Sequence, residues 1–274
     1  MPAQSRLALL AAAVAGLFAS AWGIQSEAAI MHRQRIHGQP GSVHLDVFYE
    51  SMCPYCHKFF NETLRFFWQD DEIRPLVDLD LHPAGNLQAI PMASVSKGYL
   101  FWHPEKTNHS YVYLCQHGES ECLGNLIHMC AKKVLVDPDK YMPLYFCMAA
   151  QPESVPEKSS YGCMEELSIE PEPIRDCVQS PTANEEMFAV IQADVGLDPP
   201  RKYVPWVVLN GKHLEIQDGK ADLRTAICSA LGENAPESCS QSLSAKVTQF
   251  MQQQVADGPA SPGPCYWNAT SRAF

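Results

Sequence analysis

The first part of the chain shows a strand–helix–strand pattern. Polarity alternates with the period of a β-strand at Val43, Leu45, Val47 and Tyr49. Pro54 follows closely and suits the first turn of a helix, because its φ is already helical and it has no N–H to satisfy. A helix with one apolar face is predicted from the spacing of Cys56, Phe60, Thr63, Leu64 and Phe67. A second alternating run, over residues 77–81, predicts another strand.

The remainder of the chain divides into a cysteine-rich stretch and a terminal hairpin. From about residue 85 to 181 strand signals are few, and we expect a mainly helical insertion that disulfides hold together. Residues 205–209 then predict a strand. Asn210-Gly211 predicts a tight hairpin turn after it, because both residues tolerate a positive φ. Asp222 can cap a final helix.

This order of elements is that of a thioredoxin-like α/β fold carrying a mainly helical, disulfide-stapled insertion. We divide the chain into a signal peptide (1–23), a flexible lead-in (24–41), a thioredoxin-like domain (42–239) and a polar tail (240–274). The tail is rich in Gln, Ser and Pro. We expect it to lie outside the core and to be a candidate for removal by processing.

The N-terminus has the layout of a cleavable signal peptide. Arg6 precedes an apolar run over residues 7–19, and Ala21 and Gly23 place small residues two apart. The run is shorter than the roughly 20 apolar residues that span a bilayer, so we expect no membrane span.

Three sequons are glycosylation acceptors if the chain passes through the secretory lumen: Asn61, Asn108 and Asn268. On a regular helix Asn61 falls roughly 140° away from Cys56, on the outward side, where a glycan is sterically feasible.

Charge and cysteine content narrow the function classes. The formal charge of −11 argues against a nucleic-acid partner, because phosphate contacts need a surplus of Lys and Arg. Eleven cysteines in a chain that enters an oxidising compartment indicate disulfides. If Cys53 and Cys56 are set aside, nine cysteines remain, which is an odd number. At least one thiol is then free, lost by processing, or used in a disulfide-linked dimer.

The segment Cys53-Pro54-Tyr55-Cys56 carries the candidate chemistry. It stands between a predicted strand and a predicted helix, so Cys53 would face unpaired backbone N–H groups at the helix N-terminus. That setting favours the thiolate, which is the nucleophile in disulfide exchange. Cys56 lies one turn inside the helix and would resolve the mixed disulfide. A static disulfide is the alternative. A zinc site is disfavoured, because no second cysteine pair has ligand spacing.

Residues 115–130 form the most specific motif of the chain, C-Q-H-G-E-S-E-C-L-G-N-L-I-H-M-C. It resembles the signature of the gamma-interferon-inducible lysosomal thiol reductase family, C-Q-H-G-x-x-E-C-x-x-N-x-x-x-x-C, at every fixed position. The resemblance extends from about Ser42 to Cys239 and includes Gly85-Asn86 and residues 203–207.

The resemblance implies an enzyme of endosomes and lysosomes that reduces protein disulfides at acidic pH. Cys53 and Cys56 become the redox pair, and an external small thiol, rather than a bound cofactor or metal, supplies electrons. In thioredoxin-like folds a cis proline lies against this pair, which assigns Pro205 to substrate positioning. His117 either tunes Cys53 or braces the insertion, and the second interpretation is favoured. Eight cysteines are candidates for structural disulfides: Cys115, Cys122, Cys130, Cys147, Cys163, Cys177, Cys228 and Cys239.

Some features depart from the family pattern. Pro54-Tyr55 differs from the small pair of the mammalian enzyme and matches glutaredoxins, which leaves the redox potential open. Cys265 and Asn268 lie beyond the resemblance.

Two alternative functions stay open. A disulfide oxidase or isomerase of the secretory pathway would use the same cysteine pair at a different potential. A non-catalytic secreted binding module would keep only the fold, although the presence of both cysteines weighs against it. Lysosomal, endosomal and extracellular destinations all fit the sequence.

The signal-peptide interpretation makes a direct prediction. The mature chain should begin near Ile24, because the small residues at Ala21 and Gly23 mark the cleavage site. N-terminal sequencing of the secreted protein checks this, and retention of Met1 would contradict it.

Overall fold

A computed structural model describes residues 41–96, 109–151, 154–216, 222–240 and 265–266. The proposed signal peptide, almost all of the lead-in, and the sequons at Asn108 and Asn268 lie outside these residues. None of the helices in the described ranges has the combination of length and apolar character needed to cross a bilayer.

A four-stranded sheet in the order β2-β1-β6-β7 forms the centre of the domain. β1 (Val43–Tyr49) pairs in parallel with β2 (Val77–Pro83). On its other side β1 pairs antiparallel with β6 (Trp206–Leu209), which forms a hairpin with β7 (Lys212–Leu214). This is the strand order and direction of a thioredoxin-like sheet, so the fold class predicted from the sequence is confirmed.

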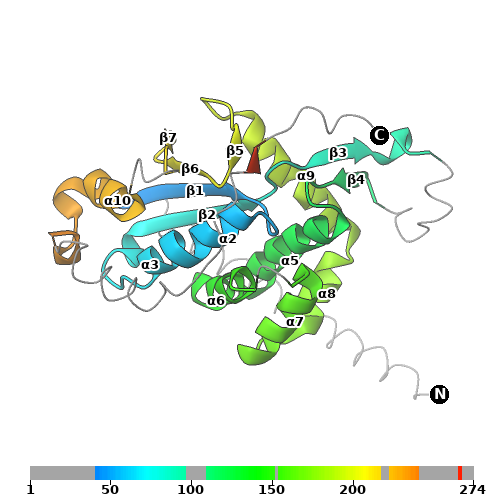
Figure 1. Cartoon of the computed structure of the whole chain (residues 1–274), viewed down its shortest axis with the longest axis horizontal. Helices are drawn as coiled ribbons and strands as arrows, with labels where there is room; N and C mark the ends of the chain where they lie inside the picture. Colours follow the sequence, from blue (N-terminus) through cyan, green and yellow to red (C-terminus); the bar gives the residue numbers. More distant parts are fainter. Residues whose placement is uncertain (1–40, 97–108, 152–153, 217–221, 241–264, 267–274) are drawn as a thin grey trace, which may run out of the picture.

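One helical stretch connects the two parallel strands, as parallel pairing requires. It consists of α2 (Pro54–Lys58), a π-helical segment (Phe59–Leu64) and α3 (Arg65–Trp68). It runs alongside β1 and β2 in Figure 1. The stretch places its apolar face, including Phe60 and Leu64, in the main core. The hairpin turn also forms as predicted, with φ of 49° at Asn210 and 76° at Gly211.

The two faces of the sheet bury separate clusters. Alternate residues of β1, beginning with Val43, enter the main core between the sheet and the helices. The opposite face buries a smaller cluster around Phe48, Tyr203 and Trp206. The indole of Trp206 stacks on the ring of His213 with centroids 3.5 Å apart. The alternation seen in the sequence therefore separates two apolar layers.

The insertion is mainly helical, as predicted, and gathers below the sheet in Figure 1. Its helices are α5 (Glu119–Leu135), α6 (Pro138–Ala149), α7 (Pro156–Glu166) and α8 (Pro171–Val178), and α9 (Pro181–Val195) follows. A two-stranded sheet of β3 (Gln88–Pro91) and β4 (Tyr111–Leu114) was not predicted. Each of its strands has only four residues, too few for alternation to stand out.

The last described elements close the fold. α10 (Leu223–Leu231) begins at Asp222, whose carboxylate accepts a hydrogen bond from the Thr225 N–H at 2.7 Å. Two short strands, β5 (Tyr203–Val204) and β8 (Cys265–Tyr266), pair antiparallel. The tail was expected to lie outside the core, but Cys265 is buried in the main core cluster. That expectation was wrong for this part of the tail.

The expectation of an outward-facing Asn61 was also wrong. Its Nδ2 donates a hydrogen bond to the Ala149 carbonyl at the end of α6, at 2.8 Å. Arg65 donates a second bond to its Oδ1 at 3.2 Å. The segment that carries Asn61 is π-helical, so the angles of a regular α-helix do not apply to it. In addition, α6 of the insertion packs on the side of this segment that was expected to face solvent. This arrangement argues against a glycan on Asn61.

Candidate active site

The two cysteines of the C-x-x-C segment lie where strand β1 turns into helix α2. Cys53 is the N-cap residue, in extended conformation, and Pro54 occupies the first helical turn. The proline fits there because a backbone N–H in the first turn would have no carbonyl partner within the helix, so its absence breaks no hydrogen bond. Cys56 lies within the helix, and both residues are almost fully buried.

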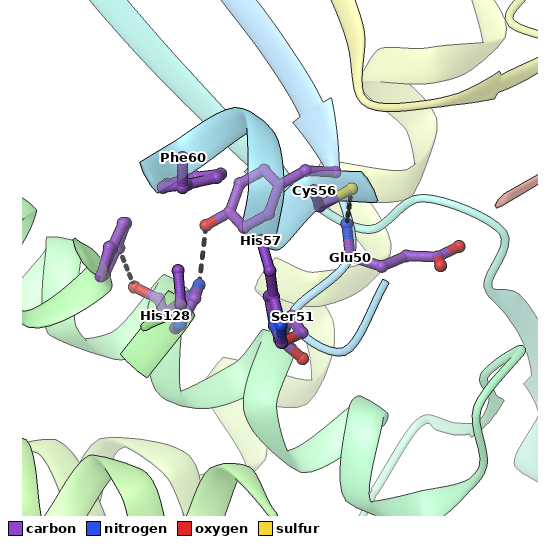
Figure 2. A pocket seen from close by; sticks show the side chains of 9 residues that line it. Glu50, Ser51, Cys56, His57, Phe60 and His128 are labelled. Carbon is purple, nitrogen blue, oxygen red and sulfur yellow. Dashed lines mark hydrogen bonds between the residues drawn. The ribbon is translucent and has the colours of Figure 1, made fainter. Parts of the chain in front are cut away.

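Cys56 is the one free cysteine in the chain. Its Sγ lies 3.5 Å from the backbone N–H of Glu50, which Figure 2 shows. Burial raises the pKa of the Cys56 thiol well above its usual value, and the nearby Glu50 carboxylate raises it further. Cys56 is therefore a protonated thiol at neutral and acidic pH, which suits a resolving residue more than an attacking one.

Cys53 is not paired with Cys56. Its sulfur is joined to Cys265, 212 residues away in the sequence. Cys265 lies outside the family resemblance, and its partner could not be predicted from the sequence. The structure shows instead that a tail cysteine reaches the reactive centre.

The tail meets the reactive centre as an added strand. Val204 of β5 pairs with Cys265 of β8, and the next peptide bond, Val204–Pro205, is cis as the fold predicts. The Cys53 Sγ lies 3.9 Å from the Val204 carbonyl oxygen. Asn86 adds a side-chain hydrogen bond to the Cys265 carbonyl at 3.2 Å. Pro205 thus directly follows the residue whose carbonyl faces the Cys53 sulfur and whose backbone pairs with Cys265.

The signature motif of residues 115–130 packs against the loop that precedes Cys53. Asn125 accepts a hydrogen bond from the Ser51 N–H at 2.9 Å, and the Ser51 hydroxyl donates to the Glu121 carbonyl at 3.1 Å. Gly124 allows this approach, because a Cβ there would lie 2.3 Å from the Ser51 Oγ. The motif therefore fixes the position of the loop that leads into Cys53.

Polar side chains of the same motif extend to the reactive centre. Gln116 accepts a hydrogen bond from the Asn86 side chain at 2.7 Å. The His117 Nδ1 hydrogen-bonds the Glu121 carboxylate and lies 3.5 Å from the Glu50 carboxylate. His117 was interpreted mainly as a brace of the insertion. It does contact α5 through Glu121, but it also faces the buried acid next to the cysteines.

Glu50 is the functional candidate that the sequence analysis missed. It follows β1, and its side chain is fully buried. Gly85 leaves room for it, since a Cβ at that position would lie 2.5 Å from the Glu50 Cγ. Burial raises the pKa of Glu50 to about 7, and the charge of Glu121 acts in the same direction. A charged residue after an apolar strand was its one signal in the sequence.

A small pocket lies behind Cys56, between α2 and the insertion (Figure 2). The His57 ring nitrogen Nε2 lies 2.6 Å from the Ser51 carbonyl oxygen, and His128 Nδ1 lies 3.0 Å from the Tyr49 hydroxyl. Burial lowers the pKa of His57, and it lowers that of His128 to about 3. Burial therefore disfavours the charged form of both rings.

The remaining eight cysteines, all proposed as structural, form four disulfides: Cys115–Cys122, Cys130–Cys177, Cys147–Cys163 and Cys228–Cys239. With Cys53–Cys265, ten cysteines pair within the chain and the eleventh, Cys56, is buried. The eleven cysteines, all of them in described ranges, thus leave no exposed thiol for the disulfide-linked dimer that the sequence allowed.

The fold and this site define a class of protein. A thioredoxin-like sheet, a C-x-x-C segment at the start of its first helix and a cis proline that follows Val204, whose carbonyl faces the Cys53 sulfur, are the features of a thiol–disulfide oxidoreductase, and the protein is of this class. A structure with a similar arrangement is BdbD from Bacillus subtilis in its oxidised form. It is 16% identical, with a TM-score of 0.47, and the match covers 72% of this chain and 94% of that chain.

Sequence comparison finds one family to which the chain is similar. The model of the gamma interferon inducible lysosomal thiol reductase family matches residues 44–167. The gamma-interferon-inducible lysosomal thiol reductase of Carassius auratus is 29% identical over 215 residues, which cover 76% of each chain. The mouse protein of the same name is 26% identical over 201 residues, or 72% of each chain. The chain is thus similar to members of this family over most of its length, as the signature indicated.

The contact between Gly124 and Ser51 makes a stability prediction. Gly124→Ala should destabilise the protein by about 1–3 kcal/mol, because the new methyl group overlaps the Ser51 hydroxyl and Pro156. Gly162→Ala is the matched control, since Gly162 is also helical and a Cβ there meets nothing within 4 Å. That change should be neutral or stabilise the helix by up to about 1 kcal/mol. Urea unfolding of both variants tests the difference in sign, and equal effects would contradict it.

Proposed function

We propose that this protein reduces disulfide bonds of protein substrates through Cys53 and Cys56, by way of a mixed disulfide. One observation carries the assignment of roles. The Cys53 sulfur is in a disulfide with an extended segment that lies on β5 as an added strand, and the free Cys56 lies one turn further along the helix. A substrate cysteine joined to Cys53 would have the same arrangement.

The reaction then has two exchanges. The Cys53 thiolate attacks a substrate sulfur, a Cys53–substrate bond forms, and the second substrate sulfur leaves with the electron pair. Cys56 next attacks the Cys53 sulfur, which closes the Cys53–Cys56 disulfide and releases the other substrate sulfur as a thiol. The substrate gains two electrons and the enzyme loses two. A small external thiol restores the dithiol.

We also propose that the reaction runs at acidic pH, in endosomes or lysosomes. The names of the relatives from Carassius auratus and mouse include the word lysosomal, which supports this destination. The N-cap position of Cys53 supports activity in acid, because unpaired N–H groups at the start of a helix stabilise a thiolate.

The roles of the two cysteines can be separated by trapping. Cys56→Ser should accumulate a covalent complex between Cys53 and a disulfide-bonded substrate, because nothing in the enzyme resolves it. Cys53→Ser should form no such complex, because the attacking sulfur is gone. Both variants should lose turnover. Non-reducing gels at about pH 5, with enzyme previously reduced by a small thiol, provide the measurement.

The trapping experiment can fail in two ways. Accumulation of complex in Cys53→Ser alone would reverse the roles of the two cysteines. Full activity in both variants would place the reaction elsewhere in the chain.

The bond to Cys265 predicts a latent enzyme. While this bond is intact, Cys53 cannot attack a substrate, so the unreduced protein should be inactive and Cys53 should resist alkylation. Cys265→Ser should remove the requirement for prior reduction of this bond and expose a Cys53 thiolate with an alkylation midpoint below about pH 7. Mass spectrometry after alkylation across a pH series measures both effects. Both proteins should also carry Cys56→Ser, so that Cys53 cannot pair with Cys56; equal labelling of Cys53 in the two unreduced proteins would then argue against latency.

A further inference from the structure

A carboxyl group and a histidine lie beside the sulfur that stands in for substrate. A carboxylate oxygen of Glu50, a ring nitrogen of His117 and the Sγ of Cys265 all lie within 4.8 Å of one another. Because Cys265 is bonded to Cys53, its sulfur occupies the position of the substrate sulfur that leaves when Cys56 resolves the mixed disulfide. The leaving sulfur is thus next to a buried acid.

Glu50 is placed beside both sulfurs of the release step. Its backbone N–H faces the Cys56 Sγ at 3.5 Å. Its Oε1 accepts a hydrogen bond from the Asn86 N–H, whereas its Oε2 is buried, makes no hydrogen bond in the described part of the chain and faces only the His117 Nδ1 at 3.5 Å among the contacts found there. A buried carboxyl oxygen without a hydrogen bond is costly unless a ligand completes it or a proton neutralises it.

We propose that the carboxyl group of Glu50 is the general acid that protonates the departing substrate sulfur. The inference rests on the proposed roles of Cys53 and Cys56. Cys56 attacks the Cys53 sulfur, the Cys53–Cys56 bond forms, and the bond to the substrate sulfur breaks with the electron pair on that sulfur. Glu50 gives the sulfur its proton. The proton that Cys56 loses passes to the resulting carboxylate, so the step is balanced without another reactant.

The surrounding charges keep this acid protonated in an acidic compartment. Burial and the charge of Glu121 raise the pKa of Glu50 to about 7, against the opposing effects of the Asn86 N–H, His117 and Arg201. Cys56 and His57 of α2 are the other titratable neighbours: the buried Cys56 is an uncharged thiol in acid, and burial lowers the pKa of His57, which disfavours its cation. At about pH 5 the carboxyl therefore holds its proton, whereas above about pH 7 it does not.

His117 acts as a positioning residue. Its Nδ1 hydrogen-bonds Glu121, which raises the pKa of His117, and the resulting cation lies between the Glu121 and Glu50 carboxyl groups. It thereby limits how far Glu121 raises the pKa of Glu50. This role also explains why the histidine and the glutamate occur together in the motif that packs on the reactive loop.

The test compares leaving groups of different acidity. A sulfur of high pKa needs a proton to leave easily, whereas an aromatic thiolate of low pKa leaves without one. In a Cys265→Ser background, Glu50→Gln should slow release of a cysteine peptide about tenfold at about pH 5. This is below the range typical of general acids, because thiolates are already good leaving groups. Release of a nitro-substituted aromatic thiol should change less than about twofold. Rapid acid quench and mass spectrometry of the Cys53 mixed disulfide give both rates.

Several outcomes decide the matter. Equal slowing of both leaving groups would show a structural role, and unchanged release of both would also overturn the proposal. If Cys53 forms no mixed disulfide even with Glu50 present, the proposed function itself fails. The advantage of Glu50 over Gln should vanish as pH rises past about 7.

A second variant guards against misfolding of Glu50→Gln. His117→Gln removes the cation that lowers the pKa of Glu50, so the decline in peptide release should move to higher pH. A decline that stays in place or moves to lower pH would contradict the assignment.

Discussion

The active site depends on the burial of a thiol and a carboxyl group at the end of one strand. The backbone N–H of Glu50 contacts the Cys56 sulfur. Neither the Cys56 thiol nor the Glu50 carboxyl group ionises easily, because burial disfavours the charged form of each. The site is therefore arranged to hold protons on both groups until the disulfide exchange takes place. The rest of the domain supplies the conditions for that burial. The sheet fixes the end of β1, and the insertion excludes water from the far side of the loop.

Disulfides stabilise the insertion, which packs against the loop between β1 and Cys53. The Cys130–Cys177 bond closes a separation of 47 residues and joins α5 to α8, and Cys147–Cys163 joins α6 to α7. In the chain-entropy view, bridges of this length stabilise the fold by roughly 3–4 kcal/mol each. None of the four structural bridges contains Cys53 or Cys56. Disulfide exchange at the proposed reactive pair can therefore proceed while the insertion continues to cover Glu50.

Local patterns predicted the fold but not the groups brought together from distant segments. The alternation of β1, Pro54 at the helix start and the Asn210-Gly211 turn each act over a few residues, so they could be read from the sequence. Glu50 could not, because its burial depends on Gly85 and on the motif that contains His117. The prediction for Asn61 failed for a related reason, because its side chain donates a hydrogen bond to the carbonyl of Ala149, a residue far away in the sequence. β8 has two residues, which no periodicity can reveal.

Glu50 and His128 oppose each other in the pH dependence of stability. The folded pKa of Glu50 is raised, so its cost to stability is absent below its unfolded value and grows as pH rises towards about 7. The folded pKa of His128 is lowered to about 3, so its cost is absent at high pH and grows as pH falls below about 6.5. From these two shifts, Glu50 costs about 1 kcal/mol and His128 about 2 kcal/mol of stability at about pH 5. At about pH 7 Glu50 costs about 3 kcal/mol and His128 almost nothing. The sums are nearly equal. These two groups together therefore add no large change in stability between acidic and neutral compartments, although Glu50 is protonated in acid, where the proposed chemistry needs it.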